Sequence, residues 1–217
     1  MIGGTGGSGT RIIANILAEA GVFLSDQSGS GDSVDMIGNW SSSILPYWNC
    51  TLPNAMDKAI REEIEETLTH FLASRDIAKT SLGWGWKLPP HVFFIPFLHQ
   101  IWPKLRCIHV VRDGRDMALS RNQNQLNYLG PVVLSPSDLI LPPEQRSIIL
   151  WEKLNVSLAD YAAQYLPDQY LRLNYEDLCH SPQENISRLF NFLGVKEGAS
   201  TYAEQIQSSP RLGHWQQ

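Results

Sequence analysis

The chain has 217 residues and a mass of 24.4 kDa; 43% of its residues are hydrophobic and 18% are charged. A chain of this size and apolar content can bury a sizeable core, so we expect one domain over residues 1–217 and exclude disorder as its main state. The net charge of -5 and the pI near 5.6 argue against a dedicated nucleic-acid-binding protein, whose surface is normally basic. Any polyanion must therefore bind in a local basic pocket.

The cysteines and the first residues suggest a cytoplasmic protein. Cys50, Cys107 and Cys179 are odd in number and show no CxxC spacing, so they predict neither a disulfide framework nor a zinc site. The sequence opens without a charged segment followed by an apolar stretch, and no apolar run reaches about 18 residues, so we expect neither a secretory signal nor a membrane span. Asn-x-Ser/Thr triplets occur in the chain, and they leave a lumenal catalytic domain as the alternative.

The N-terminal part of the chain predicts a strand, a turn and a helix. A short apolar start leads into a glycine-rich turn and then into residues 10–20, where apolar residues recur at helical spacing. A short strand at residues 22–24 precedes residues 25–54, which are rich in Ser, Gly, Asp and Trp and show little periodicity. We expect a long irregular excursion there, and such loops are often functional.

The rest of the chain alternates predicted helices and strands. Residues 130–143 indicate a hydrophobic linker interrupted by prolines. This alternation predicts an α/β fold, a three-layer sandwich in which helices flank a central, mainly parallel sheet. Helices are expected over residues 56–72, 92–102, 144–165 and 182–193 and after Gly114, and strands over residues 84–87, 106–111 and 169–173.

Residues 3–11, GGTGGSGTR, predict a phosphate site between the first strand and the first helix. Glycines let backbone N–H groups approach an anion closely, and a helix N-terminus adds unpaired donors and a positive dipole end. A flexible tail or a purely structural turn is the alternative. Compared with the pattern GxxxxGK[ST], Thr10 stands at the lysine position and Arg11 at the hydroxyl position, so the usual clamp for ATP or GTP turnover is missing.

Residues 107–120, CIHVVRDGRDMALS, predict a second anion site. An apolar strand ends at Arg112, Gly114 allows a turn, and Ser120 lies about two helical turns further on. Arg112 and Ser120 are therefore expected to face one crevice at the carboxyl edge of the sheet. The alternative is a surface cluster of ion pairs at a helix start.

Together the two segments resemble the sulfotransferases that use 3′-phosphoadenosine 5′-phosphosulfate (PAPS). In that family a PxSGTT-type loop holds the 5′-phosphosulfate, and an Arg and Ser pair at eight-residue spacing holds the 3′-phosphate. Residues 171–178, LRLNYEDL, are similar to a family stretch whose tyrosine lies near the adenine, and residues 211–215, RLGHW, are similar to its C-terminal loop. The resemblance implies a fold like that of the P-loop NTPases. It assigns nucleotide binding to Gly6, Gly7, Ser8, Gly9, Thr10, Arg11, Arg112, Ser120, Tyr175, Arg211 and Gly213.

The catalytic cations depart from the family pattern. Gly7 stands where the family usually has Lys or Arg, and Arg11 is the candidate substitute, because a guanidinium can bind a phosphosulfate through two hydrogen bonds. An exposed helix arginine is the alternative for Arg11. Lys87 resembles a lysine at the end of the third strand that points at the sulfuryl group or the acceptor in carbohydrate and protein sulfotransferases. A surface lysine lying over a tryptophan is the alternative for Lys87.

The general base has several candidates. Leu88 follows Lys87 where many cytosolic relatives carry a catalytic histidine. A carboxylate, Asp26 or Asp32, is the favoured base, and His91 is the imidazole candidate. Three aromatic residues of the irregular excursion line an acceptor pocket or else pack on the core, namely Trp40, Tyr47 and Trp48.

These observations predict an enzyme that moves a sulfuryl group from PAPS to a hydroxyl or amine acceptor, with 3′-phosphoadenosine 5′-phosphate as the product. The resemblance implies no metal. A small molecule, a carbohydrate or a peptide are all suitable acceptors, because acceptor choice lies in loops over a shared scaffold. The alternatives are a P-loop nucleotide kinase or NTPase and a non-catalytic PAPS-binding protein, the latter motivated by Gly7 and the missing histidine.

Overall fold

The computed structural model describes residues 1–24, 32–33, 36, 40–45, 48, 58–73, 82–195 and 202–204. Most of the predicted elements fall within these ranges, whereas much of the excursion over residues 25–54 and everything after residue 204 lie outside them. Among the described helices, none is both long enough and apolar enough to cross a membrane.

Parallel strands form the centre of the fold. Strand β4 (Cys107–Val111) lies between β1 (Ile2–Gly4) and β5 (Tyr170–Asn174). Strands β2 (Phe23–Leu24) and β3 (Trp84–Gly85) pair with each other, and a parallel bridge from Ile2 to Lys87 joins them to β1. The order is therefore β2-β3-β1-β4-β5. The chain leaves β1 toward β2 and leaves β4 toward β5, so the connections diverge between β1 and β4, where a crevice forms at the carboxyl ends of parallel strands.

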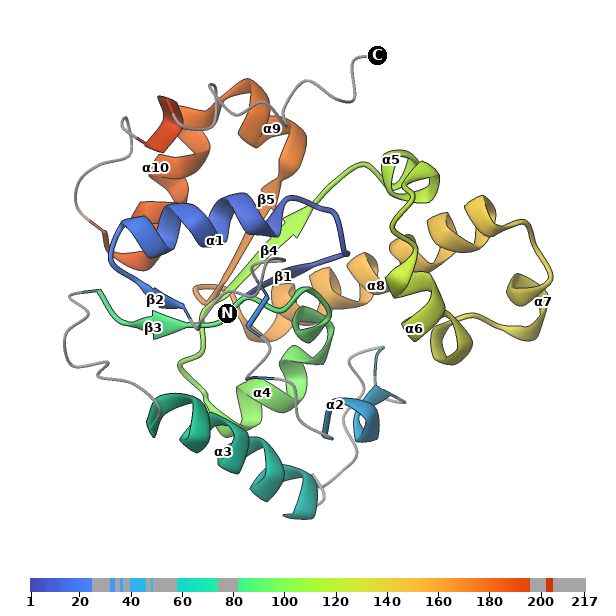
Figure 1. Cartoon of the computed structure of the whole chain (residues 1–217), viewed down its shortest axis with the longest axis horizontal. Coiled ribbons are helices and arrows are strands. Elements are labelled where there is room, and N and C mark those ends of the chain that lie inside the picture. Colours follow the sequence, from blue (N-terminus) through green and yellow to red (C-terminus); the bar gives the residue numbers. More distant parts are fainter. Residues whose placement is uncertain are drawn as a thin grey trace.

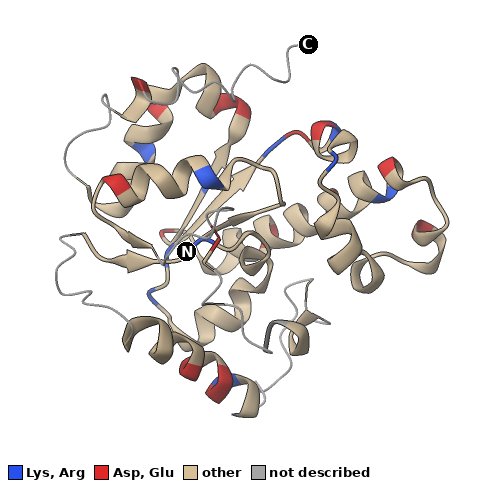
Figure 2. Ribbon diagram, in the orientation of Figure 1, with Lys and Arg blue, Asp and Glu red and all other residues tan. Residues whose placement is uncertain are grey.

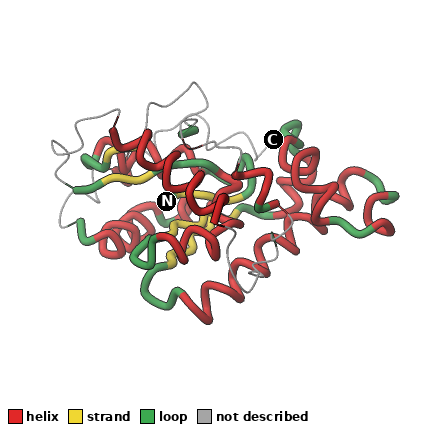
Figure 3. Tube along the Cα trace, turned by 90° about the horizontal axis from the view of Figure 1, so that it is seen from below, coloured by secondary structure: helices red, strands yellow, loops and turns green. Residues whose placement is uncertain are grey.

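Helices cover both faces of this sheet (Figure 1), as a three-layer α/β fold requires. Turned by 90°, the molecule shows its strands lying inward, with helices on either side (Figure 3). The helices are α1 (Thr10–Glu19), α2 (Trp40–Ser43), α3 (Lys58–Ala73), η4 (Pro89–Phe94, a 3₁₀ helix), α4 (Ile95–Ile101), α5 (Gly114–Leu119), α6 (Asn124–Val133), α7 (Pro136–Leu139), α8 (Pro143–Tyr165), α9 (Tyr175–His180) and α10 (Pro182–Leu193).

The two faces of the sheet bury different cores because successive strand residues point to opposite sides. Ile108 and Val110 of β4 pack with α1 and α10, whereas Cys107 belongs to the other core. That second core contains buried residues of α3, η4, α4, α6 and α8. Acidic and basic residues lie mostly on the helices and loops (Figure 2), as on the outer face of α3, where Lys58 pairs with Glu62. The predicted amphipathic helix over residues 56–72 is thus confirmed.

The long helices and the strands agree with the sequence predictions within two residues at either end. Helix α10 spans the predicted residues 182–193, and Gly194 ends it with a φ of 78°, a left-handed conformation that glycine adopts without steric cost. The helix predicted over residues 92–102 is wrong at its start. The chain forms the 3₁₀ helix η4 first, beginning at the Pro-Pro break, and turns into α4 only at Ile95.

The linker predicted over residues 130–143 is wrong. Gly130 and Pro131 lie inside helix α6, which packs on α8 and buries Leu126 and Leu129. After α6 the chain forms α7, which starts with a capping box: the Ser135 side chain accepts a hydrogen bond from the Asp138 N–H, and the Asp138 carboxylate accepts one from the Ser135 N–H. Packing on α8 outweighs the local preference of Gly and Pro against helix.

Two buried histidines make the fold sensitive to acid. His91 and His109 are each 1% exposed, and burial lowers the pKa of each from 6.5 to about 3. Between these pH values the unfolded chain binds protons that the folded chain does not bind. The free energy of unfolding therefore falls as the pH falls, by roughly 1.4 kcal/mol per pH unit for each histidine.

Urea unfolding between pH 7 and pH 4.5 checks this expectation. We expect a steady loss of stability below pH 6.5 and a shallower slope for His109→Gln, which removes one of the two titrating groups. His99→Gln, which makes the same substitution at a partly exposed histidine, serves as the control. A stability that stays constant down to pH 4.5 would contradict the prediction.

Candidate functional site

A cavity of about 940 Å³ lies at the carboxyl ends of β1, β3 and β4. The glycine-rich loop between β1 and α1 forms one wall, and Asp32, Lys87, Arg112 and Tyr175 form others. The sequence separates these residues widely, and the sheet brings them together because parallel strands end at one edge. The protein has a net charge of -5, yet the charged residues that line this cavity are three cations and one carboxylate, counted over the described residues.

The loop between Gly4 and Thr10 exposes hydrogen-bond donors to the cavity. The Ser8 N–H donates to Thr5 O at 3.0 Å and closes a turn, while Gly7 and Gly9 adopt φ values of 97° and 96°. Within the described part of the chain, no partner accepts a hydrogen bond from the N–H groups of Gly7, Gly9 or Thr10. The Ser8 hydroxyl is also without a partner there, but Ser8 is fully buried and does not line the cavity. Such N–H donors at the start of a helix suit the oxygens of an anion.

Tyr175 lies directly against this loop. It is the first residue of α9, immediately after β5, and a Cβ atom added at Gly9 would overlap its ring carbon Cδ2. The Arg112 guanidinium carbon lies 5.0 Å from the centroid of the same ring, on the scale of a cation–π contact. Any side chain at position 9 would therefore push apart the loop and the Tyr175–Arg112 pair.

Arg112 follows β4 and has contacts on both sides of the crevice. Its Nη1 donates to Gly7 O at 3.4 Å, and its Nη2 lies 3.0 Å from an Asp116 carboxylate oxygen. The surface ion pair considered as the alternative for this motif also exists, because the exposed Arg115 binds Asp113 at 2.5 Å. The hydrogen bond from Arg115 lowers the pKa of Asp113 to about 2. One motif thus contains a surface pair and, beside it, a cation in the cavity.

Ser120 does not join Arg112 in the cavity. Helix α5 has only six residues, and Ser120 is its C-terminal cap, with an Oγ that accepts a hydrogen bond from the Asn122 N–H at 3.1 Å. Ser120 is absent from the residues that line the cavity. The helix after Arg112 is therefore shorter than the two full turns that the spacing predicts, and it ends before Ser120.

Lys87 and Asp32 form a charged pair at the end of β3. The Lys87 Nζ donates to Asp32 Oδ1, although Lys87 is only 2% exposed. Ser33, the residue after Asp32, is bonded to the backbone of Lys87. The Lys87 N–H donates to Ser33 Oγ at 2.9 Å, and the Ser33 N–H donates to Lys87 O at 2.7 Å. Burial lowers the pKa of Lys87, the bond to Asp32 opposes this shift, and the positive charge of Arg11 adds to it. Two cations therefore converge on this wall of the cavity.

The remaining candidates are divided between the core and undescribed positions. His91 is buried in η4 and does not line the cavity, and Trp48 packs against the core. Several candidates lie outside the described residues, namely Asp26, Tyr47, Arg211, Gly213 and the side chain of Trp40.

A further wall of the cavity was not predicted from the sequence. Asn122, Asn124, Gln125 and Tyr128 line it from the turn before α6 and from α6 itself. Gln125 accepts a hydrogen bond from the Gly6 N–H at 2.9 Å, so this loop donor, expected to bind the nucleotide, is bonded to the protein instead. The run Asn-Gln-Asn-Gln after the second motif was the available signal, but sequence spacing did not place it beside residues more than a hundred positions earlier.

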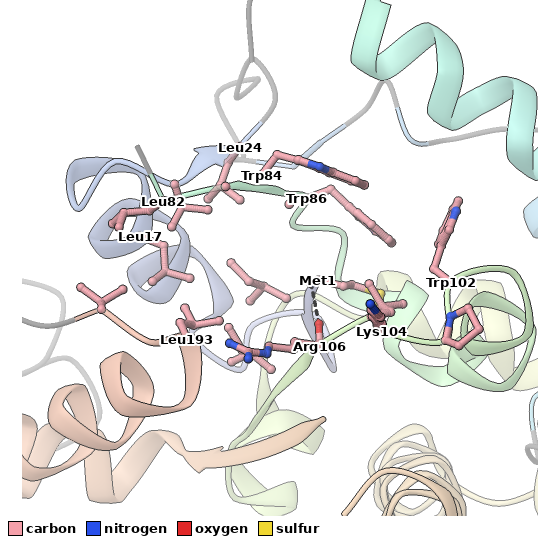
Figure 4. A pocket seen from close by; sticks show the side chains of 18 of the residues that line it. Met1, Leu17, Leu24, Leu82, Trp84, Trp86, Trp102, Lys104, Arg106 and Leu193 are labelled. Atoms are coloured by element: carbon pink, nitrogen blue, oxygen red, sulfur yellow. Dashed lines mark hydrogen bonds between the residues drawn. The ribbon is translucent and has the colours of Figure 1, made fainter. Parts of the chain in front are cut away.

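A second cavity lies at the opposite edge of the sheet, where the strands begin (Figure 4). It measures about 610 Å³, and its walls include Leu17, Trp84, Trp86 and Trp102. It shares no lining residue with the first cavity. The loop donors and the Lys87–Asp32 pair belong to the first cavity, so we place the candidate site there.

Comparisons with known proteins concern the fold and the family of the chain. No curated protein matches the chain at a significant level. The solved sulfotransferase domain from the curacin biosynthetic pathway matches with a TM-score of 0.59 and 17% identity, covering 98% of this chain and 78% of that one. The sulfotransferase domain from the Synechococcus PCC 7002 olefin synthase matches with a TM-score of 0.55 and 17% identity, covering 100% of this chain and 81% of that one. At this identity the likeness concerns the fold.

A family profile gives the assignment. The profile described as the sulfotransferase family matches residues 1–197. This range contains the glycine-rich loop, the Lys87–Asp32 pair, Arg112 and Tyr175. Because the profile covers most of the chain and every described wall of the cavity, the chain belongs to the sulfotransferase family.

Proposed function

We propose that this sulfotransferase takes its sulfuryl group from PAPS and transfers it to a hydroxyl or amine acceptor in the cavity at the carboxyl edge of the sheet. One observation carries the proposal: loop N–H groups that have no partner among the described residues and the cations Arg11, Lys87 and Arg112 meet in one cavity of an acidic protein. The two anionic ends of one adenosine nucleotide need two separate anion-binding sites, or cradles. The strand-to-helix turns after β1 (Gly4 to Thr10) and after β4 (Arg112 to Gly114) would provide them.

The residues of the loop fit the phosphosulfate end of such a donor. The N–H groups of Gly7, Gly9 and Thr10 would donate to its oxygens, whereas the Ser8 hydroxyl is buried outside the cavity lining. Arg112, after β4, would face the 3′-phosphate, with Tyr175 supporting its guanidinium. When bound, the donor supplies a sulfuryl group whose sulfur–oxygen bond to the phosphate breaks while a bond to the acceptor forms, and 3′-phosphoadenosine 5′-phosphate leaves.

Lys87 and Arg11 would stabilise the charge that gathers on the leaving oxygen. Both side chains line the cavity, and Arg11 compensates for Gly7, which stands where relatives carry a cation in the loop. Lys87 is largely buried, and a charge interacts more strongly where water is excluded. Positioning and charge stabilisation would therefore supply most of the rate enhancement.

Asp32 is the carboxylate we propose as general base. It lies in the cavity beside Lys87, and its side chain keeps 28% of its exposure, so an acceptor can reach it. The acceptor's proton would pass to an Asp32 carboxylate oxygen as the bond to sulfur forms. His91 is the weaker candidate because its ring is buried away from the cavity lining.

Radiolabelled PAPS tests the proposal. The purified protein is incubated with the labelled donor and a panel of phenols, sugars, amines and hydroxyl-bearing peptides. We expect label on at least one acceptor and an equal amount of 3′-phosphoadenosine 5′-phosphate. Nucleotide binding without transfer to any acceptor would favour a non-catalytic binding protein, and magnesium-stimulated ATP hydrolysis would favour a P-loop NTPase.

A further inference from the structure

We infer that Gln125 is a positioning residue that fixes the glycine-rich loop in the shape that binds the 5′ end of the donor. The inference rests on the proposed function of the cavity. Gln125 lies in the first turn of α6, and its side chain lines the cavity beside the loop. It contributes no charge, so it acts through the backbone of the loop.

The Gln125 carboxamide binds the loop entrance through both of its polar atoms. Its Oε1 accepts a hydrogen bond from the Gly6 N–H at 2.9 Å, and its Nε2 donates to Gly4 O at 3.3 Å. The opposite amide orientation would set an NH₂ group against an N–H and an oxygen against a carbonyl, so both contacts agree on one assignment. One planar group thus fixes the distance between the last carbonyl of β1 and an amide two residues later.

The loop needs such an external clamp. Its single internal backbone hydrogen bond among the described residues joins Ser8 to Thr5, and three of the residues between Gly4 and Thr10 are glycines, which lose more conformational entropy on ordering than other residues. Both ends are held: Gly4 lies against the backbone of Val110, and Gly9 lies against Tyr175. Gln125 holds the stretch between these ends, and a loop ordered in advance binds its ligand with a smaller entropic cost.

The clamp also determines which donors face the ligand. The Gly6 N–H is used by Gln125, while the N–H groups of Gly7, Gly9 and Thr10 have no partner within the described residues. Without Gln125 the Gly6 N–H would lose its acceptor, and the loop would no longer be held in a fixed position relative to α6. We therefore expect the effect of Gln125 to concentrate on the 5′-phosphate of the nucleotide.

Gln123 extends the same connection to the second motif. Its Nε2 donates to Ser120 O at 2.6 Å at the end of α5, and its Oε1 accepts from Ser147 Oγ at 2.9 Å in α8. Residues 123–125 thus join the glycine-rich loop to the end of the segment that begins with Arg112. The two cradles are held at a fixed spacing by this turn.

Calorimetry on Gln125→Met tests the inference, since Met has similar length but forms neither hydrogen bond. We expect the Kd of 3′-phosphoadenosine 5′-phosphate to rise about tenfold, as for the loss of a pair of ordering hydrogen bonds. The Kd of adenosine 3′-monophosphate, which lacks the 5′-phosphate and is measured by displacement, should change less than about twofold. Gln145→Met makes the same chemical change at an exposed position of α8 and should alter neither value.

Gln125→Glu is the second variant, because it retains an acceptor for the Gly6 N–H but sets a carboxylate oxygen against Gly4 O. We expect it to raise the KM for the donor with little change in the KM for the acceptor. Equal losses for both nucleotides, or a Gln125→Met protein that binds 3′-phosphoadenosine 5′-phosphate like the wild type, would overturn the inference. If the wild type binds neither nucleotide, it is the proposed function that fails. If Gln125→Met does not fold, the Glu variant decides by the same comparison.

Discussion

Replacing Lys87 with Met is expected to lower kcat by about a thousandfold, because a preorganised charge on a developing anion is worth roughly 10² to 10³ in rate. Lys87 is 2% exposed, and its Nζ points at Asp32 inside the cavity, so its charge acts where little water screens it. Loss of the Lys87 charge should raise the free energy of the transition state more than that of the bound nucleotide. The Kd of 3′-phosphoadenosine 5′-phosphate should therefore change by less than about threefold.

Single-turnover transfer from PAPS measures the chemical step, and calorimetry measures nucleotide affinity. Lys104→Met, an exposed lysine outside the cavity, is the matched control and should keep wild-type rates. The pH dependence adds a second criterion. Burial lowers the pKa of Lys87 below 10.5, so kcat should fall as the pH rises through this lowered value, and Lys87→Arg should shift that decline to higher pH. Wild-type rates for Lys87→Met would contradict the assignment.

Replacing Arg112 with Ala is expected to weaken binding of 3′-phosphoadenosine 5′-phosphate by about a hundredfold, because hydrogen bonds to charged groups contribute roughly 1.5–3 kcal/mol each. Arg112 lines the cavity, contacts Gly7 O and lies over the Tyr175 ring, so its guanidinium is already oriented before a ligand arrives. Arg112→Lys should recover only part of the loss, since an ammonium lacks the planar fork.

Arg115→Ala is the control for Arg112. Arg115 is exposed, and its described ion pair is with Asp113 at the start of α5, so its removal should change nucleotide affinity by less than about twofold. Calorimetry on the three proteins at one salt concentration provides the comparison. Equal losses for the two arginines would mean that the motif acts only through surface charge.

The glycine-rich loop and the end of β4 could be predicted from the sequence because each is a local pattern. Glycines between a predicted strand and a predicted helix indicate a turn, and an apolar run that ends at Arg112 indicates the end of a strand. Lys87 could be placed at a strand end for the same reason. Even Asp32 was among the candidates, although the sequence did not show that its carboxylate lies against Lys87.

Ser120 and the region after it could not be predicted in the same way. The spacing from Arg112 to Ser120 suggested two helical turns, but α5 stops at Leu119, where Gln123 binds the carbonyls of its last turn. Gly130 and Pro131 suggested a linker, yet packing against α8 keeps them in α6. The second outcome depends on packing against the distant helix α8, which local propensity does not include, whereas the first depends on side-chain hydrogen bonds from the nearby Gln123.

The sequence by itself determined the class of fold and the order of the strands and the longer flanking helices, and it indicated the two motifs proposed to bind anions, because periodicity and turn residues act over short distances. Only the tertiary structure decided which of these residues share a cavity. It placed Lys87 against Asp32, Tyr175 against Gly9, and Gln125 against a loop that precedes it by 119 residues. Lys87 and Tyr175 meet their partners because parallel strands separated in the chain end at one edge of the sheet, and Gln125 reaches the loop from helix α6; spacing along the chain encodes neither relation.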